Sequence, residues 1–240
     1  MNLQRLDKII ASQSGISRTD AKADIRHGLV SVDGAVSRDP SVLISVENAE
    51  IIYKGQAVSY KKYIYIVMNK PKGVLSASND KNRKTVVDLV PPELSRSGLF
   101  PVGRLDKDTT GLLLITDDGQ FAHRVISPKS DIKKVYEVLL DAPIPTDAVE
   151  KFSAGVVLAD GTKCLPADLK IIEPQKARVE IREGKYHQIK RMFGVLDLGV
   201  NQLKRLSVGG LTLPKELNEG ECRELTESEL KNVEKRFVHK

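Results

Sequence analysis

Apolar residues recur along this chain at two different spacings, which predict helices and strands in an irregular order. Near the start, Leu3, Leu6, Ile9 and Ile10 recur at helical spacing. Short apolar runs that predict strands lie at 63–68, 112–116, 134–140, 168–172, 176–182 and 203–208. Helical patterns lie at 118–127, 145–154, 187–196 and 226–235. Because strands and helices do not alternate regularly, we expect an α+β fold with a mixed, largely antiparallel sheet flanked by helices.

The first part of the chain carries its own start and stop signals. Ser17 can cap a second helix, with Asp20 at the third position after it, and Gly28 suits the end of that helix. Asp33-Gly34 is a tight hairpin signal, and Ile51–Tyr53 predicts a further short strand. This segment therefore predicts a small module of its own that contains both helices and strands.

A polar stretch at Lys54–Lys62 separates this module from the apolar run that follows. A chain of 240 residues is long enough for two modest domains. We therefore predict a small domain at 1–59 and a larger one at 60–240, and we expect the linker to allow the two to move.

The charge is unevenly distributed between these two parts. The whole chain carries a net charge of +6, with a pI of about 9.2. Residues 1–60 hold seven Lys or Arg and seven Asp or Glu, so the excess lies downstream. Within the small domain, Arg18, Lys22 and Arg26 follow one another at a spacing of four and form one basic stripe on the second helix. Such a stripe suits the successive phosphates of a nucleic acid, although many charged helix faces are simply solvated.

Several classes of protein are disfavoured by composition. Cys164 and Cys222 have no metal-site spacing to each other or to histidine, so we expect reduced thiols of the cytoplasm and no metal. The N-terminal MNLQRLDKII has no apolar core of a signal peptide, and no apolar run is long enough to span a membrane. We expect a cytoplasmic protein that acts as a monomer.

The stretch FPVGRLDKDTTGLLLITDDG, at Phe100–Gly119, crowds charged side chains beside an apolar run. Its DxDxT spacing is also that of magnesium-dependent phosphatases of the haloacid dehalogenase type, but Pro101 interrupts the strand that should precede their nucleophile. A calcium-loop spacing fits too, with Asp117 at the twelfth position, although such a loop needs a helix on each side. The third interpretation is that Asp106 acts alone among basic neighbours.

Arg5–Gly34, RLDKIIASQSGISRTDAKADIRHGLVSVDG, resembles the S4-type RNA-binding module that takes its name from a small-subunit ribosomal protein. This resemblance implies that the small domain binds structured RNA through its second helix and the following hairpin. The candidate contacts in this module are Arg5, Lys8, Arg18, Lys22 and Arg26.

The larger domain resembles the pseudouridine synthases, whose central motif G-R-L-D-x-x-T-x-G-L is matched at Gly103–Leu112. Four further segments match that family: NKPKG at Asn69–Gly73, KKVYEVLL at Lys133–Leu140, EGKYHQIKRMF at Glu183–Phe193 and LKRLSVGGLTL at Leu203–Leu213. The match is most similar to the RsuA-type enzymes, which modify a uridine of small-subunit (16S) ribosomal RNA. Many relatives carry Arg where this chain has Lys190, which offers a point charge instead of a bidentate grip.

The resemblance implies a catalytic domain that isomerises uridine to pseudouridine after base flipping, with no cofactor and no metal. It gives roles to Asp106 as the essential acid, Tyr136 as the tyrosine that stacks on uracil, Lys190 as the cation beside Asp106, and Leu203 as an apolar wall. Arg104, Lys185, Arg191 and Arg205 are candidates for holding the RNA backbone. The expected partner is ribosomal RNA within a partly assembled small subunit. Action on large-subunit (23S) RNA and a non-catalytic role in ribosome assembly are the alternatives.

Overall fold

The computed structural model describes residues 3–234 and divides the chain into two compact units. The first contains Met1–Ile64 and Val90–Leu99, and the second contains Tyr65–Leu89 and Phe100–Lys240. The N-terminal unit therefore also includes a segment that the sequence prediction had placed in the larger domain, and the predicted division at 59/60 stays a prediction. Among residues 3–234, no helix has the length and apolar character needed to cross a bilayer.

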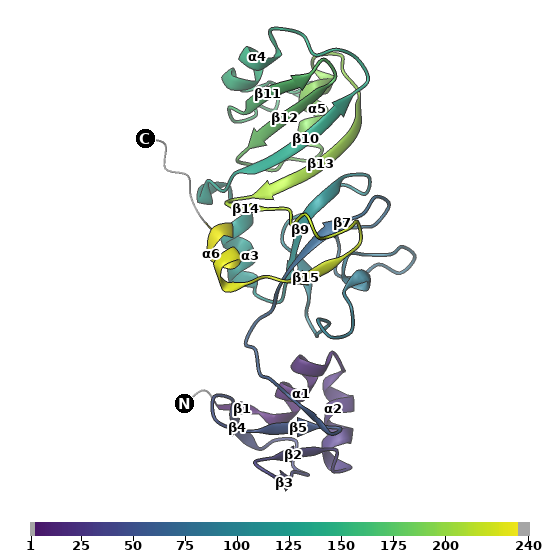
Figure 1. Cartoon of the computed structure of the whole chain (residues 1–240), viewed down its shortest axis with the longest axis vertical. Coiled ribbons are helices and arrows are strands. Elements are labelled where there is room, and N and C mark those ends of the chain that lie inside the picture. The colour runs from purple at the N-terminus through teal and green to yellow at the C-terminus, as the bar shows by residue number, and fades with distance from the viewer. Residues whose placement is uncertain (1–2, 235–240) are drawn as a thin grey trace. The chain divides into compact units, whose positions relative to one another are not determined.

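The N-terminal unit packs two helices against short antiparallel strands (Figure 1). Its elements are β1 (Leu3–Arg5), α1 (Leu6–Ser14), α2 (Arg18–Arg26), β2 (Val30–Val32), β3 (Ala35–Val36), β4 (Leu43–Ser45), β5 (Ile51–Tyr53) and β6 (Gln56–Ala57). The strand order is β3-β2-β5-β6, and β1 pairs separately with β4. Both helices, the hairpin at Asp33-Gly34 and the strand at Ile51–Tyr53 confirm the sequence prediction, but Leu3 lies in a strand and not in the first helix.

The cap of α2 forms as the sequence predicts. The Ser17 hydroxyl accepts a hydrogen bond from the backbone N–H of Asp20 at 3.1 Å. Ile9 and Ile10 from α1 and Ile25 from α2 are fully buried together in the core of this unit. Since the apolar positions of both helices face this core, the charged positions of α2 are left towards solvent.

The second unit is built on one mixed sheet. Its strands are β7 (Tyr65–Lys70), β8 (Phe100–Pro101), β9 (Thr110–Thr116), β10 (Lys134–Leu140), β11 (Asp168–Glu173), β12 (Lys176–Ile181), β13 (Val200–Val208), β14 (Leu211–Thr212) and β15 (Cys222–Glu224). The order is β11-β12-β10-β13-β9-β7-β15, and the pairings are antiparallel except for β13 with β9. This architecture confirms the predicted α+β class with a mixed, largely antiparallel sheet.

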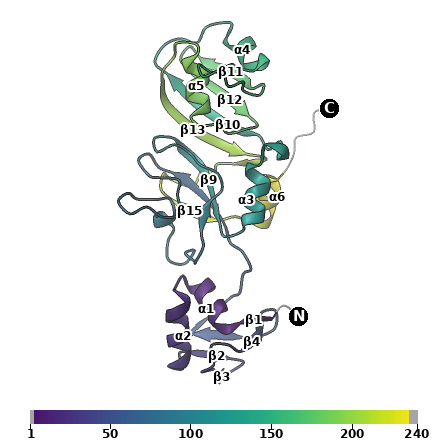
Figure 2. The same cartoon turned by 180° about the vertical axis from the view of Figure 1, so that it is seen from behind.

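Helices cover this sheet in two groups. They are α3 (Gly119–Ile126), α4 (Ala148–Ala154), α5 (Gln188–Gly194) and α6 (Glu227–Val233), with single turns of 3-10 helix at Val87–Leu89 and Pro128–Ser130. In both views α3 and α6 lie side by side (Figures 1 and 2). Phe152 of α4 contacts Phe193 of α5, with ring centroids 5.0 Å apart. All four predicted helices are present, and position 235 of the last prediction lies outside the described residues.

The parallel contact between β9 and β13 depends on Gly111. Lys204 and Arg205 of β13 pair with Thr110 and Gly111 of β9. A Cβ atom at Gly111 would lie 2.3 Å from the carbonyl oxygen of Arg205, and the φ angle of Gly111 is +98°. Only glycine tolerates both the close approach and this backbone angle. The loop that precedes β9 is thereby fixed beside β13 and β10.

Candidate active site

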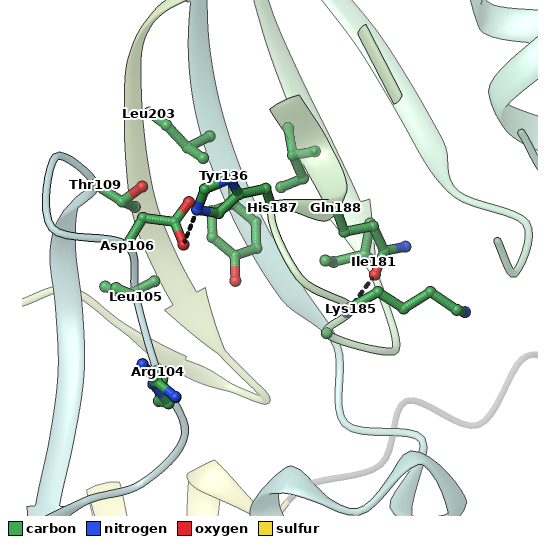
Figure 3. Close-up of a pocket in the computed structure, with 12 residues that line it drawn as sticks. Arg104, Leu105, Asp106, Thr109, Tyr136, Ile181, Lys185, His187, Gln188 and Leu203 are labelled. Carbon is green, nitrogen blue, oxygen red and sulfur yellow. Dashed lines mark hydrogen bonds and ion pairs between the residues drawn. The ribbon is translucent and has the colours of Figure 1, made fainter. Parts of the chain in front are cut away.

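A pocket in the second unit brings together residues that are far apart in the sequence. Asp106 comes from the loop between β8 and β9, Tyr136 from β10, and Leu203 from β13. Ile181 at the end of β12 and His187 at the start of α5 complete the group. Figure 3 shows the side chains of Asp106, Tyr136, His187 and Leu203 directed towards one another from these different elements.

The loop that carries Asp106 is held by hydrogen bonds on both sides of that residue. The Ser76 hydroxyl donates to the carbonyl of Leu105 at 2.8 Å and accepts from its N–H at 3.1 Å. After Asp106, the N–H of Gly73 donates to the carbonyl of Lys107 at 2.7 Å. Both anchors come from the segment after β7, so the NKPKG motif and its extension fix the catalytic candidate in place.

Lys70, the first of the two lysines in that motif, is completely buried beneath the same loop. Its ammonium group donates to the carbonyls of Pro71 at 3.0 Å, Lys107 at 3.3 Å and Thr109 at 3.0 Å. Burial lowers the pKa of Lys70 to about 8, against the attraction of Asp108 and Asp106. The sequence prediction gave Lys70 no role, although a lysine inside a buried strand is itself a signal, since lysines are almost never fully buried without partners.

The cation predicted beside Asp106 has a second partner. The Lys190 ammonium lies 2.7 Å from both carboxylate oxygens of Asp108 and 3.6 Å from Oδ2 of Asp106. The hydrogen bond from Lys190 lowers the pKa of Asp108. Asp108 is therefore an exposed acid of the turn, with 56% of its side chain open, that is paired with the active-site lysine.

His187 is a second basic neighbour of Asp106 that the sequence prediction missed. Its Nε2 lies 3.5 Å from Oδ1 of Asp106. His187 has a φ angle of +47°, in the left-handed region that non-glycine residues seldom adopt. The imidazole is stacked on the ring of Tyr186, with centroids 3.9 Å apart. The two carboxylate oxygens of Asp106 thus face different basic groups, His187 on one side and Lys190 on the other.

Tyr136 and Leu203 provide the apolar part of the pocket. Each has 7% of its surface exposed, so both are largely packed in the sheet, and both line the pocket. Leu203 pairs with Val138 on β10, two positions beyond Tyr136. Because successive residues of a strand point to opposite faces, Tyr136 and Val138 share the face covered by α5. A planar base could lie between the tyrosine ring and this apolar wall beside Asp106.

The residues predicted to hold the RNA backbone near this pocket occupy different environments. Arg104 lines the pocket and is exposed. Lys185 also lines it but forms an ion pair with Glu183, and its ammonium points away from Asp106 in Figure 3. Arg191 forms an ion pair with Asp160 at 2.5 Å. Arg205 is 4% exposed and its Nε donates to the carbonyl of Leu112 at 2.7 Å, so its predicted contact with a phosphate is corrected to a structural role.

The residues predicted to bind RNA in the N-terminal unit also differ, since some are exposed and others are held in ion pairs. Arg5 and Arg18 both bind Asp7, which is fully buried, at 3.0 and 3.1 Å. Burial raises the pKa of Asp7, but the hydrogen bonds from these two arginines outweigh it and bring the pKa to about 2. Lys8 donates to Gln4, whereas Arg26 is exposed. Of the predicted contacts, Arg5 and Arg18 therefore stabilise the unit itself.

Asp118, at the end of the charged stretch that carries Asp106, has a structural role. Asp118 caps α3, where its carboxylate accepts from the N–H groups of Gln120 at 3.0 Å and Phe121 at 3.1 Å. The same carboxylate accepts a hydrogen bond from the Tyr65 hydroxyl at 2.9 Å. Within residues 3–234, no group of three His, Cys, Asp or Glu side chains is arranged to hold a metal ion.

Comparison with known proteins agrees with this geometry. Residues 64–194, more than half of the chain, match the model of the RNA pseudouridylate synthase family, and residues 4–51 match that of the S4 domain. The chain belongs to the RNA pseudouridylate synthase family and carries an N-terminal S4 domain.

Individual relatives match over nearly the whole chain. An uncharacterised RNA pseudouridine synthase of Bacillus subtilis is 44% identical, covering 94% of this chain and 96% of the relative. The ribosomal small subunit pseudouridine synthase A of Escherichia coli is 41% identical, covering 95% of this chain and 99% of the relative. A crystal structure of a pseudouridylate synthase superposes with a TM-score of 0.68 at 36% identity, covering 95% of this chain and 99% of the other.

Proposed function

We propose that this protein isomerises one uridine of small-subunit (16S) ribosomal RNA to pseudouridine, with Asp106 as the essential acid. The observation that carries the proposal is the position of the Asp106 carboxylate, between two basic groups and beside the ring of Tyr136. The choice of RNA is supported by the name of the Escherichia coli relative, a ribosomal small subunit synthase. An S4 domain, which binds RNA in other proteins, supports an RNA substrate.

The reaction breaks the bond between C1′ of the ribose and N1 of uracil, turns the base, and joins C1′ to C5. The proton on C5 is then lost and N1 takes up a proton, so the product has the same atoms as the substrate. Asp106 acts either as a nucleophile or as the base that starts an elimination. The ammonium of Lys190, 3.6 Å from Oδ2 of Asp106, places a positive charge beside this carboxylate.

The remaining groups orient the base and the strand. The ring of Tyr136 stacks on uracil, and its hydroxyl takes part in removal of the C5 proton. Leu203 closes the apolar side of the pocket. The target uridine must leave its stack to reach Asp106, at a cost of a few kcal/mol. Arg104, exposed at the pocket, fills the vacated place or holds the phosphate of the flipped nucleotide.

The test is a map of pseudouridine in unmodified small-subunit ribosomal RNA, bare or with assembly proteins, after incubation with the purified protein. We expect one new pseudouridine with the wild type and none with Asp106→Asn. Asp168→Asn is the matched control, because Asp168 is exposed on the edge strand β11 away from the pocket, and it should act as the wild type does.

Other outcomes of the same map favour the alternatives. A product that forms only in large-subunit RNA would place the substrate there. Tight RNA binding without any pseudouridine would favour a non-catalytic assembly role. The cytoplasmic location, the monomeric state and the partly assembled subunit as substrate belong to this proposal. A product that forms only when assembly proteins are present would support the partly assembled subunit as the substrate.

A further inference from the structure

Tyr186 lies in the short loop between β12 and α5, and 76% of its surface is exposed. Its neighbours in the chain, Lys185 and His187, both line the pocket that contains Asp106. The Tyr186 ring is stacked on the imidazole of His187, with centroids 3.9 Å apart and planes inclined by 18°. A ring that is covered on one face and so largely exposed has its other face open to solvent. The loop therefore presents a flat aromatic surface at the rim of the pocket.

The loop that presents this ring is rigidly held. The side chain of Gln188, which is 4% exposed, accepts from the N–H of Lys185 at 2.9 Å and donates to Glu183 at 2.8 Å. The Glu183 carboxylate also accepts from the N–H of Leu165 at 2.8 Å, which ties the loop to a distant segment. Because the backbone on either side of Tyr186 is fixed in advance, little conformational freedom remains to be lost when a partner binds the ring.

The chemistry around Tyr186 favours a base over a phosphate. Lys185, next to Tyr186 in the chain, and Arg191, which donates to the carbonyl of Tyr186 at 3.4 Å, are already engaged with Glu183 and Asp160. What remains open is the aromatic face. Every nucleobase has a flat face that stacks on such a ring, and proteins that hold single-stranded RNA commonly use this contact.

The distance to Asp106 identifies which base can reach this face. The His187 imidazole lies between Asp106 and Tyr186. Its Nε2 is 3.5 Å from Oδ1 of Asp106, and its ring centroid is 3.9 Å from that of Tyr186. We infer that the open face of Tyr186 is a stacking subsite for the base of a nucleotide next to the target uridine. This inference rests on the proposed function and adds a determinant of which uridines the enzyme accepts.

The kinetic test compares Tyr186→Ala and Tyr186→Phe on the RNA that the wild type modifies. Base–aromatic stacking is worth about 1–3 kcal/mol, and 1.4 kcal/mol is a factor of ten, so Tyr186→Ala should raise KM about tenfold. The value of kcat should stay close to that of the wild type. Tyr186→Phe keeps the aromatic face and should act as the wild type does. Val149→Ala, which removes an exposed apolar side chain from α4, is the control.

The outcome that overturns the subsite is an unchanged KM in Tyr186→Ala, or an equal loss in Tyr186→Phe, which would point to the hydroxyl. A substrate with an abasic ribose on the 5′ or the 3′ side of the target provides a double-mutant cycle. With the wild type, one of these two replacements should raise KM about tenfold. With Tyr186→Ala, the same replacement should have no further effect. If the increases in KM from Tyr186→Ala and from the abasic ribose are additive for both the 5′ and the 3′ replacement, the inference would also be overturned.

A binding experiment separates failure of the subsite from failure of the proposed reaction. The chain contains no tryptophan, so Tyr186→Trp introduces a single fluorescent reporter that preserves stacking. Unmodified small-subunit ribosomal RNA should quench this reporter and leave Val149→Trp unaffected. Quenching without any pseudouridine would mean that the subsite exists and the proposed reaction is wrong. Pseudouridine formation without quenching would mean that the reaction is right and the subsite is wrong.

Discussion

The ammonium group of Lys190 lies 2.7 Å from both carboxylate oxygens of Asp108. Its distance to Oδ2 of Asp106, the proposed catalytic acid, is 3.6 Å. In this structure one lysine therefore serves two carboxylates, and the one without a proposed chemical role holds it more closely. Asp108 is more exposed than Asp106, with 56% of its side chain open against 27%, so water screens its pair with Lys190 more strongly.

This arrangement predicts effects of very different size for two substitutions. Lys190→Met removes the cation from both acids and should slow pseudouridine formation by about 100-fold, the loss typical of a group that stabilises developing charge. Asp108→Asn releases Lys190 towards Asp106 and should keep the rate within about threefold of the wild type. Single-turnover rates on a saturating amount of RNA measure both, with the exposed Lys170→Met as control. Equal losses in the two variants would show that Lys190 and Asp108 act as one unit.

Lys70 gives the stability of the catalytic unit a specific dependence on pH. Its pKa is about 8 in the folded protein, against 10.5 for a lysine exposed to water. Unfolding therefore takes up a proton between pH 8 and 10.5, so the contribution of Lys70 to the free energy of unfolding rises with pH across this window. The difference in the free energy of unfolding between the wild type and Lys70→Met should change by about 3 kcal/mol across this pH window, because each unit of pKa corresponds to 1.36 kcal/mol.

Urea denaturation at several pH values from 7 to 10 measures this difference. Lys70→Met should also be less stable than the wild type at the upper end, because the carbonyls of Lys107 and Thr109 lose their donor. Lys81→Met, at an exposed lysine of the same unit, should give a curve parallel to that of the wild type. Parallel curves for Lys70→Met as well would mean that Lys70 titrates as an ordinary surface lysine.

Ser76 should affect the reaction although it does not line the pocket. Its hydroxyl makes two hydrogen bonds with the backbone of Leu105, next to Asp106. Ser76→Ala leaves a buried N–H and carbonyl unpaired and frees the loop, so kcat should fall about tenfold while KM changes little. Ser153→Ala, which removes a hydroxyl bonded to a helix carbonyl on the exposed α4, should leave both constants unchanged. A change in KM alone at Ser76 would indicate a contact with RNA and not a positioning role.

The fold followed from the sequence wherever apolar periodicity was long enough to be recognised. The strand predicted at 134–140 has the bounds of β10, because every second residue is buried. Strands β8 and β14 were missed, since two residues carry no periodicity and form only through their pairing with β9 and β13. Leu3 was predicted as helical because its spacing suits a helix, but pairing with Ser45 on β4 places it in a strand.

Only those site residues that lie in segments matching the family motifs could be predicted from the sequence. Asp106, Tyr136, Lys190 and Leu203 come from four separate segments, and family resemblance, not periodicity, indicated that they meet. Arg205 was assigned to the RNA because a count of charges cannot distinguish an exposed arginine from one buried against a backbone carbonyl. The position of His187 could not be foreseen either, since it depends on a left-handed backbone angle that nothing in the local sequence requires.

The basic stripe of α2 contains one arginine that we expect to bind RNA, Arg26, and one that stabilises the N-terminal unit, Arg18. Arg26 is exposed, and its backbone carbonyl accepts a hydrogen bond from the Arg38 guanidinium at 3.0 Å, so its own side chain is directed to solvent and available to a phosphate. Arg26→Ala should weaken RNA binding and reduce the slope of log K against log salt by about 0.7–0.9, with no change in Tm. Arg18→Ala should reduce Tm as well, because Arg18 is one of the two arginines that hold the pKa of the buried Asp7 at about 2.

The loss of Tm expected for Arg18→Ala should occur only in a defined pH range. The folded pKa of Asp7 lies below the value of 3.8 for an aspartate exposed to water, so the stability gained from its ionised form is complete above pH 4 and is lost as the pH falls towards 2. The loss of Tm in Arg18→Ala should therefore be full at pH 7 and shrink at pH 3. Thermal unfolding at both pH values, with salt-dependent RNA binding at pH 7, tests the two roles together. An unchanged salt slope in Arg26→Ala would show that this face of α2 does not meet the phosphates.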